Sequence, residues 1–170
     1  MKVFMAVDLE GVGGYLRWDQ ADRERERSLI TGEANAAVAG AFNGGATEVL
    51  VTEAHGNMRN IIPEEIDRRA VFLSGQPKPL NHMAGIDGTF QAAVFVGYHA
   101  KAGTLGGVMA HTYAGYVYSL RFNGLEVGEI GTDAAIAGHF GVPVVMVSGD
   151  RAACDEARAL LGDIETVVVK

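Results

Sequence analysis

The chain alternates between short apolar runs and longer segments in which apolar residues recur at helical spacing. In the first long segment, Ile30, Ala34, Val38 and Phe42 recur so that one face of a helix turns toward a core. This alternation continues to residue 169 and predicts an α/β fold, with a mostly parallel sheet flanked by helices. The predicted strands are residues 2–7, 47–52, 70–73, 92–99, 141–147 and 165–169, and the predicted helices are 19–43, 81–85, 129–140 and 150–161.

Local signals predict several boundaries. Asp19 is the expected N-cap of the first long helix. The segment Asn43–Gly45 is its expected end, because glycine readily adopts the left-handed conformation there. Between residues 116–122 and 125–128, the pair Asn123–Gly124 predicts a tight two-residue turn. We therefore expect a β-hairpin inserted into the α/β fold.

The composition limits the classes of partner. With 170 residues, of which 48% are hydrophobic, the chain suits one folded domain with a sizeable core. Its formal net charge of −7 argues against a nucleic-acid-binding surface. No apolar run approaches the length of a membrane span. The chain has a single cysteine, Cys154, which cannot form a disulfide framework and suits the role of a small buried side chain. We therefore expect a cytoplasmic protein. From the charge and the apolar runs we expect no nucleic-acid or membrane partner.

Two carboxylates follow the first predicted strand. Asp8 and Glu10 are spaced so that, on an extended chain, both side chains face the same way. Adjacent carboxylates repel each other unless positive charge lies between them, and a divalent cation commonly supplies that charge. The alternative is that Asp8 only forms a turn or caps the next helix.

Histidines follow the next two strong strands. His55 comes shortly after the second strand, and His99 ends the strand predicted over 92–99. Ligands of open α/β sheets bind beyond the carboxyl ends of the strands, so these residues would meet Asp8 and Glu10 at one edge. Mixed carboxylate and imidazole ligands suit zinc, with manganese or cobalt as alternatives. The simpler alternative is that both histidines only bond to backbone carbonyls.

Three further residues have open roles. Glu129 begins a predicted helix, where it either complements the helix dipole or points into the site. His111 follows the glycine-rich segment 100–107, which lacks the spacing of a phosphate-binding loop. His82 lies in a short predicted helix and is interpreted as a surface or capping histidine rather than a ligand.

Six stretches, in order, carry a resemblance to a known family. They are residues 6–11 (AVDLEG), 41–51 (AFNGGATEVLV), 97–101 (GYHAK), 107–111 (GVMAH), 127–131 (VGEIG) and 142–147 (VPVVMV). With these stretches, spread over nearly the whole chain, the sequence resembles the zinc-dependent D-aminopeptidase family typified by the bacterial dipeptide-operon enzyme.

The resemblance implies a metallo-aminopeptidase with two zinc ions per subunit. It implies removal of the N-terminal residue, a D-amino acid such as D-Ala, from short peptides by a water that the metal activates. It also implies a homo-oligomeric ring, which is a decamer in the best-known member. By the same resemblance, Asp8 bridges the two ions, the remaining ligands are Glu10, His55, His99 and Glu129, and the catalytic residue is His111.

The family continues beyond the point where this chain stops, by roughly another hundred residues, a size typical of one further unit. We therefore interpret residues 1–170 as a single α/β metallohydrolase domain that lacks the family's C-terminal region. Two alternatives stay open. One is a binuclear metal hydrolase acting on L-peptides, other amides or phosphoesters, although an acidic chain makes phosphate substrates less attractive. The other is a catalytically silent, metal-stabilised assembly subunit.

Overall fold

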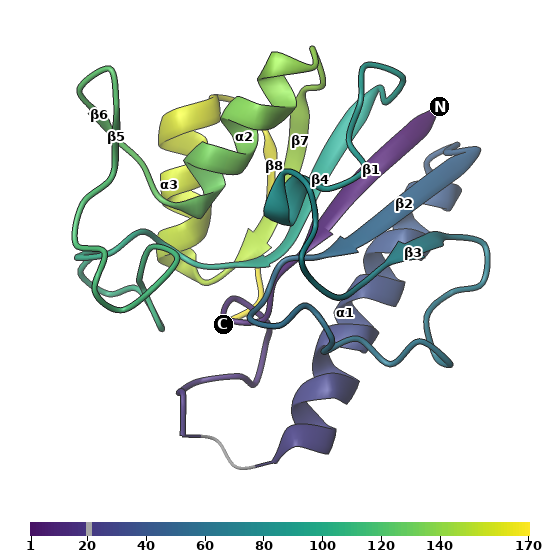
Figure 1. The fold of residues 1–170 in the computed structure, drawn as a ribbon, viewed down its shortest axis with the longest axis horizontal. Coiled ribbons are helices and arrows are strands. Elements are labelled where there is room, and N and C mark those ends of the chain that lie inside the picture. Colours follow the sequence, from purple (N-terminus) through teal and green to yellow (C-terminus); the bar gives the residue numbers. More distant parts are fainter. Residues whose placement is uncertain (20–21) are drawn as a thin grey trace.

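The computed structural model describes residues 1–19 and 22–170. It contains a six-stranded sheet in the order β3-β2-β1-β4-β7-β8, in which every neighbouring pair of strands is parallel (Figure 1). A separate antiparallel hairpin, β5-β6, surrounds Asn123–Gly124 as predicted, with shorter strands than expected. The strands are β1 (Lys2–Val7), β2 (Glu48–Glu53), β3 (Val71–Leu73), β4 (Ala92–Tyr98), β5 (Arg121–Phe122), β6 (Leu125–Glu126), β7 (Val144–Gly149) and β8 (Glu165–Val168). The predicted fold class is confirmed.

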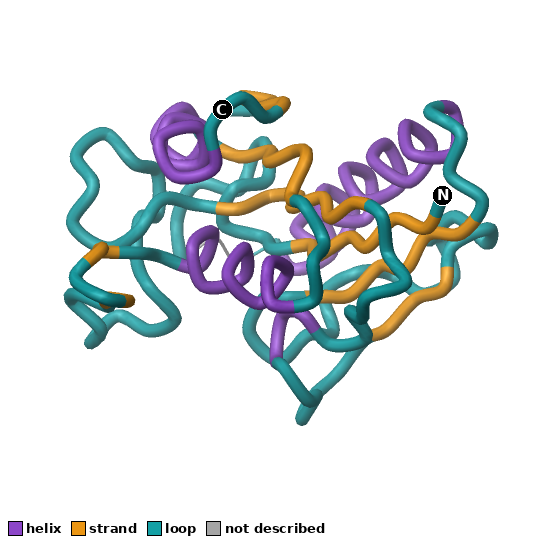
Figure 2. The backbone as a smooth tube through the Cα atoms, turned by 90° about the horizontal axis from the view of Figure 1, so that it is seen from above, coloured by secondary structure: helices purple, strands orange, loops and turns teal. Residues whose placement is uncertain are grey.

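Helices lie on both sides of the sheet (Figure 2). They are α1 (Arg23–Asn43), α2 (Glu129–His139), α3 (Arg151–Leu161) and the short 3₁₀ helix η1 (Asn81–Met83). Successive side chains of β1 point to opposite faces, so Met5 packs in the core with α1 while Phe4 packs in the core with α2 and α3. The central strand is therefore buried on both faces, as in other parallel sheets. Among the described residues, no helix is both long enough and apolar enough to cross a membrane.

The helix starts follow from side-chain caps. Asp22 caps α1, because its carboxylate accepts a hydrogen bond from the amide of Arg25 at 3.0 Å. The prediction that Asp19 is this cap was wrong; Asp19 is exposed and pairs with Arg17 at 3.0 Å. Residues 20 and 21 of the predicted first turn lie outside the described residues. Cys154, in α3, is fully buried, as expected.

Two glycines let the loop after β1 approach the end of β4. A Cβ atom on Gly11 would lie 1.9 Å from the carbonyl oxygen of Tyr98, and one on Gly97 would lie 2.4 Å from that of Asp8. Gly97 also has a φ of +70°, a conformation that favours glycine. The amide of Gly11 donates directly to the carbonyl of Gly97 at 2.7 Å. This contact brings the carboxylates that follow β1 close to the histidine that follows β4.

We expect Gly11→Ala to lower the free energy of unfolding by at least about 3 kcal/mol, because the added methyl group meets backbone atoms that cannot move aside cheaply. In a domain of this size the melting temperature should fall by roughly 6–12 °C, measured by circular dichroism. The matched control is Gly32→Ala in α1, where nothing lies within 4 Å of the added Cβ. That change should be neutral or stabilising by up to about 1 kcal/mol. An unchanged melting temperature for Gly11→Ala would contradict the close approach.

Candidate metal centre

The carboxyl ends of β2, β1 and β4 lie side by side and carry four of the candidate residues. Asp8 follows β1 and His99 follows β4 directly, while Glu10 and His55 lie a little further along their loops. From β1 the chain continues to β2 on one side and later returns to β4 on the other, so the strand order reverses here. Open α/β sheets bind ligands at such switch points. Two residues from elsewhere complete the cluster: Glu129, the first residue of α2, and His111, from the loop after β4.

Asp8 lies between two of the histidines. Its Oδ1 atom accepts a hydrogen bond from the amide of Leu9 at 2.9 Å and lies 3.5 Å from Nδ1 of His55. Its Oδ2 atom lies 3.4 Å from Nε2 of His99. The side chain is almost fully buried, with 2% of its residue surface exposed. Each carboxylate oxygen therefore faces a different imidazole, which is the arrangement that a bridging carboxylate requires.

Backbone carbonyls orient two of the imidazoles. Nδ1 of His99 donates to the carbonyl of Ala100 at 3.0 Å, and Nδ1 of His111 donates to that of Met109 at 2.9 Å. With the proton on Nδ1, the Nε2 atom of each neutral ring is a free acceptor, as a metal ligand or proton carrier requires. The two rings stack, with centroids 3.9 Å apart. His99 does bond to a backbone carbonyl, but only through Nδ1, whereas Nδ1 of His55 lies 2.6 Å from Oε2 of Glu10.

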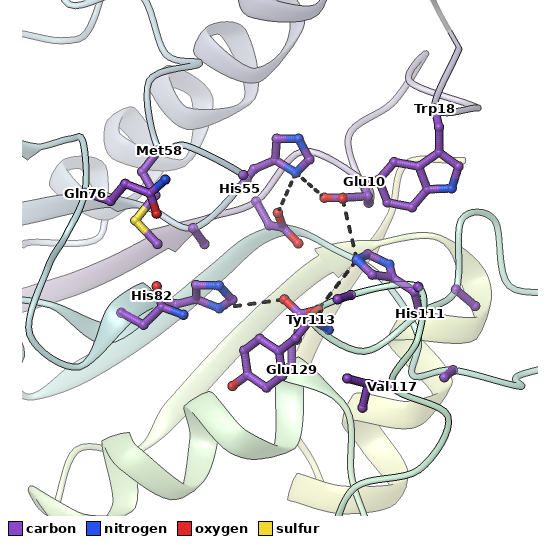
Figure 3. A pocket seen from close by; sticks show the side chains of 18 of the residues that line it. Glu10, Trp18, His55, Met58, Gln76, His82, His111, Tyr113, Val117 and Glu129 are labelled. Atoms are coloured by element: carbon purple, nitrogen blue, oxygen red, sulfur yellow. Dashed lines mark hydrogen bonds and ion pairs between the residues drawn. The ribbon is translucent and has the colours of Figure 1, made fainter.

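Glu10 and Glu129 close the cluster on opposite sides (Figure 3). Oε2 of Glu10 lies 2.6 Å from Nδ1 of His55, and its Oε1 lies 3.7 Å from Nε2 of His111. Oε1 of Glu129 accepts a hydrogen bond from the amide of Tyr113 at 2.6 Å. The same oxygen lies 3.7 Å from Nε2 of His111. Glu129 therefore points into the site rather than only complementing the dipole of α2.

The carboxylates control the charge of the imidazoles. Burial alone would lower the pKa values of His55 and His99, but hydrogen bonds to the surrounding carboxylates and their charges raise both values to about 10. Burial alone would raise the pKa of Glu10, but the hydrogen bond with His55 and its charge lower it to about 2. The cluster therefore favours positive charge, which a divalent cation can supply in place of protons.

The donor set fits a divalent metal. Oδ2 of Asp8 and Nε2 of His99 are buried and have no hydrogen-bond partner, which is rare for buried polar atoms. One ligand atom each from Asp8, Glu10 and His99 lies within 4.8 Å of the others, and so does one each from His99, His111 and Glu129. These two groups share His99. Carboxylates mixed with imidazoles are typical zinc ligands.

A pocket of about 670 Å³ opens over the cluster, a volume typical of small-molecule sites. In Figure 3, His111 lies between Glu10 and Glu129, with Trp18 beside it. The rings of Trp18 and His111 meet edge to face, with centroids 4.9 Å apart. His111 is less buried than His99, with 15% of its side chain exposed against 1%. Of the two stacked imidazoles, His111 is thus the more accessible from the pocket.

Three residues that the sequence analysis had not placed in the site lie next to Glu129. The prediction that His82 is a surface or capping histidine was wrong: it is buried, lines the pocket, and lies 3.0 Å from Asp133 and 3.7 Å from Glu129. Burial alone would lower the pKa of His82, but the bond to Asp133 and its charge raise the value to about 9. The hydroxyl of Tyr98 donates to Asp133 at 2.7 Å. The sequence signal that could have placed Asp133 in the site is its position one helical turn after Glu129, which puts both side chains on the same face of the helix.

The fold and the site together define an α/β protein with a buried carboxylate–imidazole centre at its switch point, an arrangement typical of metal-dependent hydrolases. Comparison with known proteins identifies the family. Residues 1–170 match the family model Peptidase_M55, described as D-aminopeptidase. The chain belongs to the Peptidase_M55 D-aminopeptidase family.

Two comparisons, one of sequence and one of structure, match D-aminopeptidase from Bacillus subtilis. A D-aminopeptidase of strain 168 is 42% identical over 175 residues. The solved structure of the Zn-dependent D-aminopeptidase DppA, described as a self-compartmentalizing protease, superposes with a TM-score of 0.96 at 43% identity. Both comparisons cover 100% of this chain and 64% of the other protein. The chain therefore spans just under two thirds of the length of these relatives.

Proposed function

We propose that this chain carries the catalytic centre of a zinc-dependent aminopeptidase, which removes an N-terminal D-amino acid such as D-Ala from short peptides. The observation that carries the proposal is the buried cluster in which Oδ2 of Asp8 and Nε2 of His99 face each other without hydrogen-bond partners. Membership of the D-aminopeptidase family and likeness to a Zn-dependent relative support the same metal and activity.

Five residues would hold two zinc ions. Asp8 would serve both ions, because its two oxygens face His55 and His99. When bound, the ions activate a water molecule and polarise the scissile carbonyl. The full proposed ligand set is Asp8, Glu10, His55, His99 and Glu129.

The remaining roles fall to protein groups that face the pocket. His111 carries its Nδ1 proton toward a backbone carbonyl and presents Nε2 to the cluster, so Nε2 is placed to accept the proton that the attacking water releases and to pass it to the leaving amine. Trp18, Met58 and Val117 line the pocket with apolar surface, which excludes water around a small side chain.

We also propose that residues 1–170 form one α/β metallohydrolase domain of a longer cytoplasmic protein, in which a further C-terminal unit completes the pocket walls. Support comes from the relatives, of which this chain covers 64%. The description of one relative as self-compartmentalizing supports assembly into a homo-oligomeric ring, with a decamer as the specific expectation. Short peptides would then reach the centre from inside the ring.

The first test is the metal content of protein purified without chelator, followed by hydrolysis assays. We expect close to two zinc ions per chain and chelator-sensitive release of D-Ala from D-Ala-D-Ala, because the two oxygens of Asp8 face different histidines of the proposed ligand set. L-Ala-L-Ala and a phosphomonoester serve as matched substrates. Faster turnover of L-Ala-L-Ala would replace the D-peptide assignment. Two bound zinc ions without turnover of any substrate would instead favour a metal-stabilised assembly subunit.

A further inference from the structure

Two buried carboxylates lie side by side on α2. Glu129 and Asp133 are one helical turn apart, and only 4% and 1% of their surfaces are exposed. Like charges at this spacing repel each other, and burial strengthens the repulsion. A group that offers an N–H between the two carboxylates relieves this repulsion.

His82 supplies that group. Its Nδ1 atom lies 3.0 Å from Oδ2 of Asp133 and 3.7 Å from Oε2 of Glu129. Oδ2 of Asp133 also accepts the hydroxyl proton of Tyr98 at 2.7 Å. We assign a proton to Nδ1 of His82, which then donates to the same oxygen of Asp133 that accepts from Tyr98. The N–H group lies close to Glu129 as well.

The two oxygens of Glu129 have different neighbours. Oε1 accepts the amide proton of Tyr113 at 2.6 Å and lies 3.3 Å from Nε2 of His99, within the metal cluster. Oε2 faces His82. The ring of Tyr113 covers His82, with centroids 5.5 Å apart, and its hydroxyl bonds to Thr132 of α2 at 2.7 Å. Contacts on both oxygens thus fix the orientation of the Glu129 carboxylate (Figure 3).

We propose that His82 is a positioning residue: anchored by Asp133 and Tyr98, it holds the Glu129 carboxylate in the orientation that binds metal. The inference rests on the proposed metal centre. Partners of this kind, which orient a ligand without touching the metal, typically change metal affinity by about 10- to 100-fold. Nothing in this argument requires His82 to contact the metal or the substrate.

The test is a double-mutant cycle on the full chain, with zinc affinity measured by competition with a chromophoric chelator. The Glu129→Gln variant shows which of the zinc-binding steps is weakened when this carboxylate is removed. We expect His82→Ala to weaken the same step by about 10- to 100-fold and to have less than about a threefold effect in the Glu129→Gln background. Asp133→Asn should weaken that step less. The matched control is His139→Ala, which removes an exposed histidine from the same helix and should leave zinc binding unchanged.

Melting temperatures of the metal-free variants give a second, independent reading of the cycle. His82→Ala should lower the melting temperature more in the wild-type background than in the Glu129→Gln background. In the wild-type background the change leaves two buried carboxylates, Glu129 and Asp133, without the intervening N–H group, whereas Glu129→Gln has already removed one of them. Equal falls in both backgrounds, or additive losses of zinc affinity, would show a merely structural histidine and overturn the inference. Should the wild-type chain bind no zinc, the proposed function fails, while the metal-free cycle still decides whether His82 acts on Glu129.

Discussion

A chain carrying Asp8→Asn should bind neither zinc ion and should lose peptide hydrolysis by at least about 1,000-fold. The two oxygens of Asp8 face the two histidines of the proposed ligand set, at 3.5 Å from His55 and 3.4 Å from His99. An asparagine keeps the shape but offers one neutral oxygen, so it cannot serve two cations. Metal activation is worth several kcal/mol of the barrier, and each 1.36 kcal/mol is tenfold in rate.

The same substitution should also destabilise the metal-free protein at neutral pH. Without metal, Asp8 is a buried carboxylate that lies 3.5 Å from His55 and 3.4 Å from His99, and it helps to raise the pKa values of both imidazoles to about 10. Its removal leaves two buried, protonated imidazoles with one carboxylate partner fewer. We therefore expect metal-free Asp8→Asn to melt below the temperature of the metal-free wild type. Added zinc should raise the melting temperature of the wild type only, because binding stabilises the folded state in proportion to affinity.

Elemental analysis, calorimetric unfolding with and without zinc, and the D-Ala-D-Ala assay measure these outcomes. The matched control is Asp163→Ala, which removes an exposed aspartate between α3 and β8 and should change none of them. Retention of two zinc ions by Asp8→Asn would show that another carboxylate bridges the ions. Retention of one ion would show that Asp8 serves a single site.

The site residues that follow strands could be predicted from the sequence for a simple physical reason. Each apolar run stops where the strand leaves the core, and parallel strands end at the same edge of the sheet. Asp8, His55 and His99 follow three such runs and meet in the structure. Glu129 begins a helix rather than following a strand, so pattern alone left its direction open, and the fold decides it.

His82 was beyond this kind of reasoning. It belongs to a 3₁₀ helix of three residues, too short for a periodic signal, and its partner Asp133 is 51 residues away in the sequence. The contact exists because η1 packs against α2, which no local pattern specifies. The first helix shows a similar limit: both Asp19 and Asp22 are competent caps by residue type, and the structure shows that Asp22 caps α1.

The start of β7 lies later than predicted because the first predicted residues complete the end of α2. The predicted strand covered residues 141–147, whereas β7 covers Val144–Gly149. Gly141 has a φ of +73° and the amide of Val142 still bonds back to Ala137, so these residues complete the end of α2. The later strand end places Asp150 as the cap of α3, where its carboxylate accepts from the amide of Ala153 at 2.7 Å.

His111→Ala should retain both zinc ions and lose hydrolysis by about 100- to 10,000-fold, the usual contribution of a general acid. His111 is the imidazole of the stacked pair that is more accessible from the pocket, and its Nε2 is 3.7 Å from both Glu10 and Glu129. The loss should appear mainly in kcat, because the proposed metal ligands and the apolar residues that line the pocket remain in place. Steady-state kinetics together with zinc content measure it, and His139→Ala is the matched control.

The structure also defines what would contradict this role. One ligand atom each from His111, His99 and Glu129 lies within 4.8 Å of the others, a geometry that equally suits metal binding. A His111→Ala chain that holds only one zinc ion would therefore be a ligand mutant, and its lost activity would say nothing about proton transfer. Full turnover with both ions present would remove His111 from the chemistry altogether. Only the combination of two bound ions and a depressed kcat assigns His111 to protonation of the leaving amine, because that combination separates holding the metal from moving a proton.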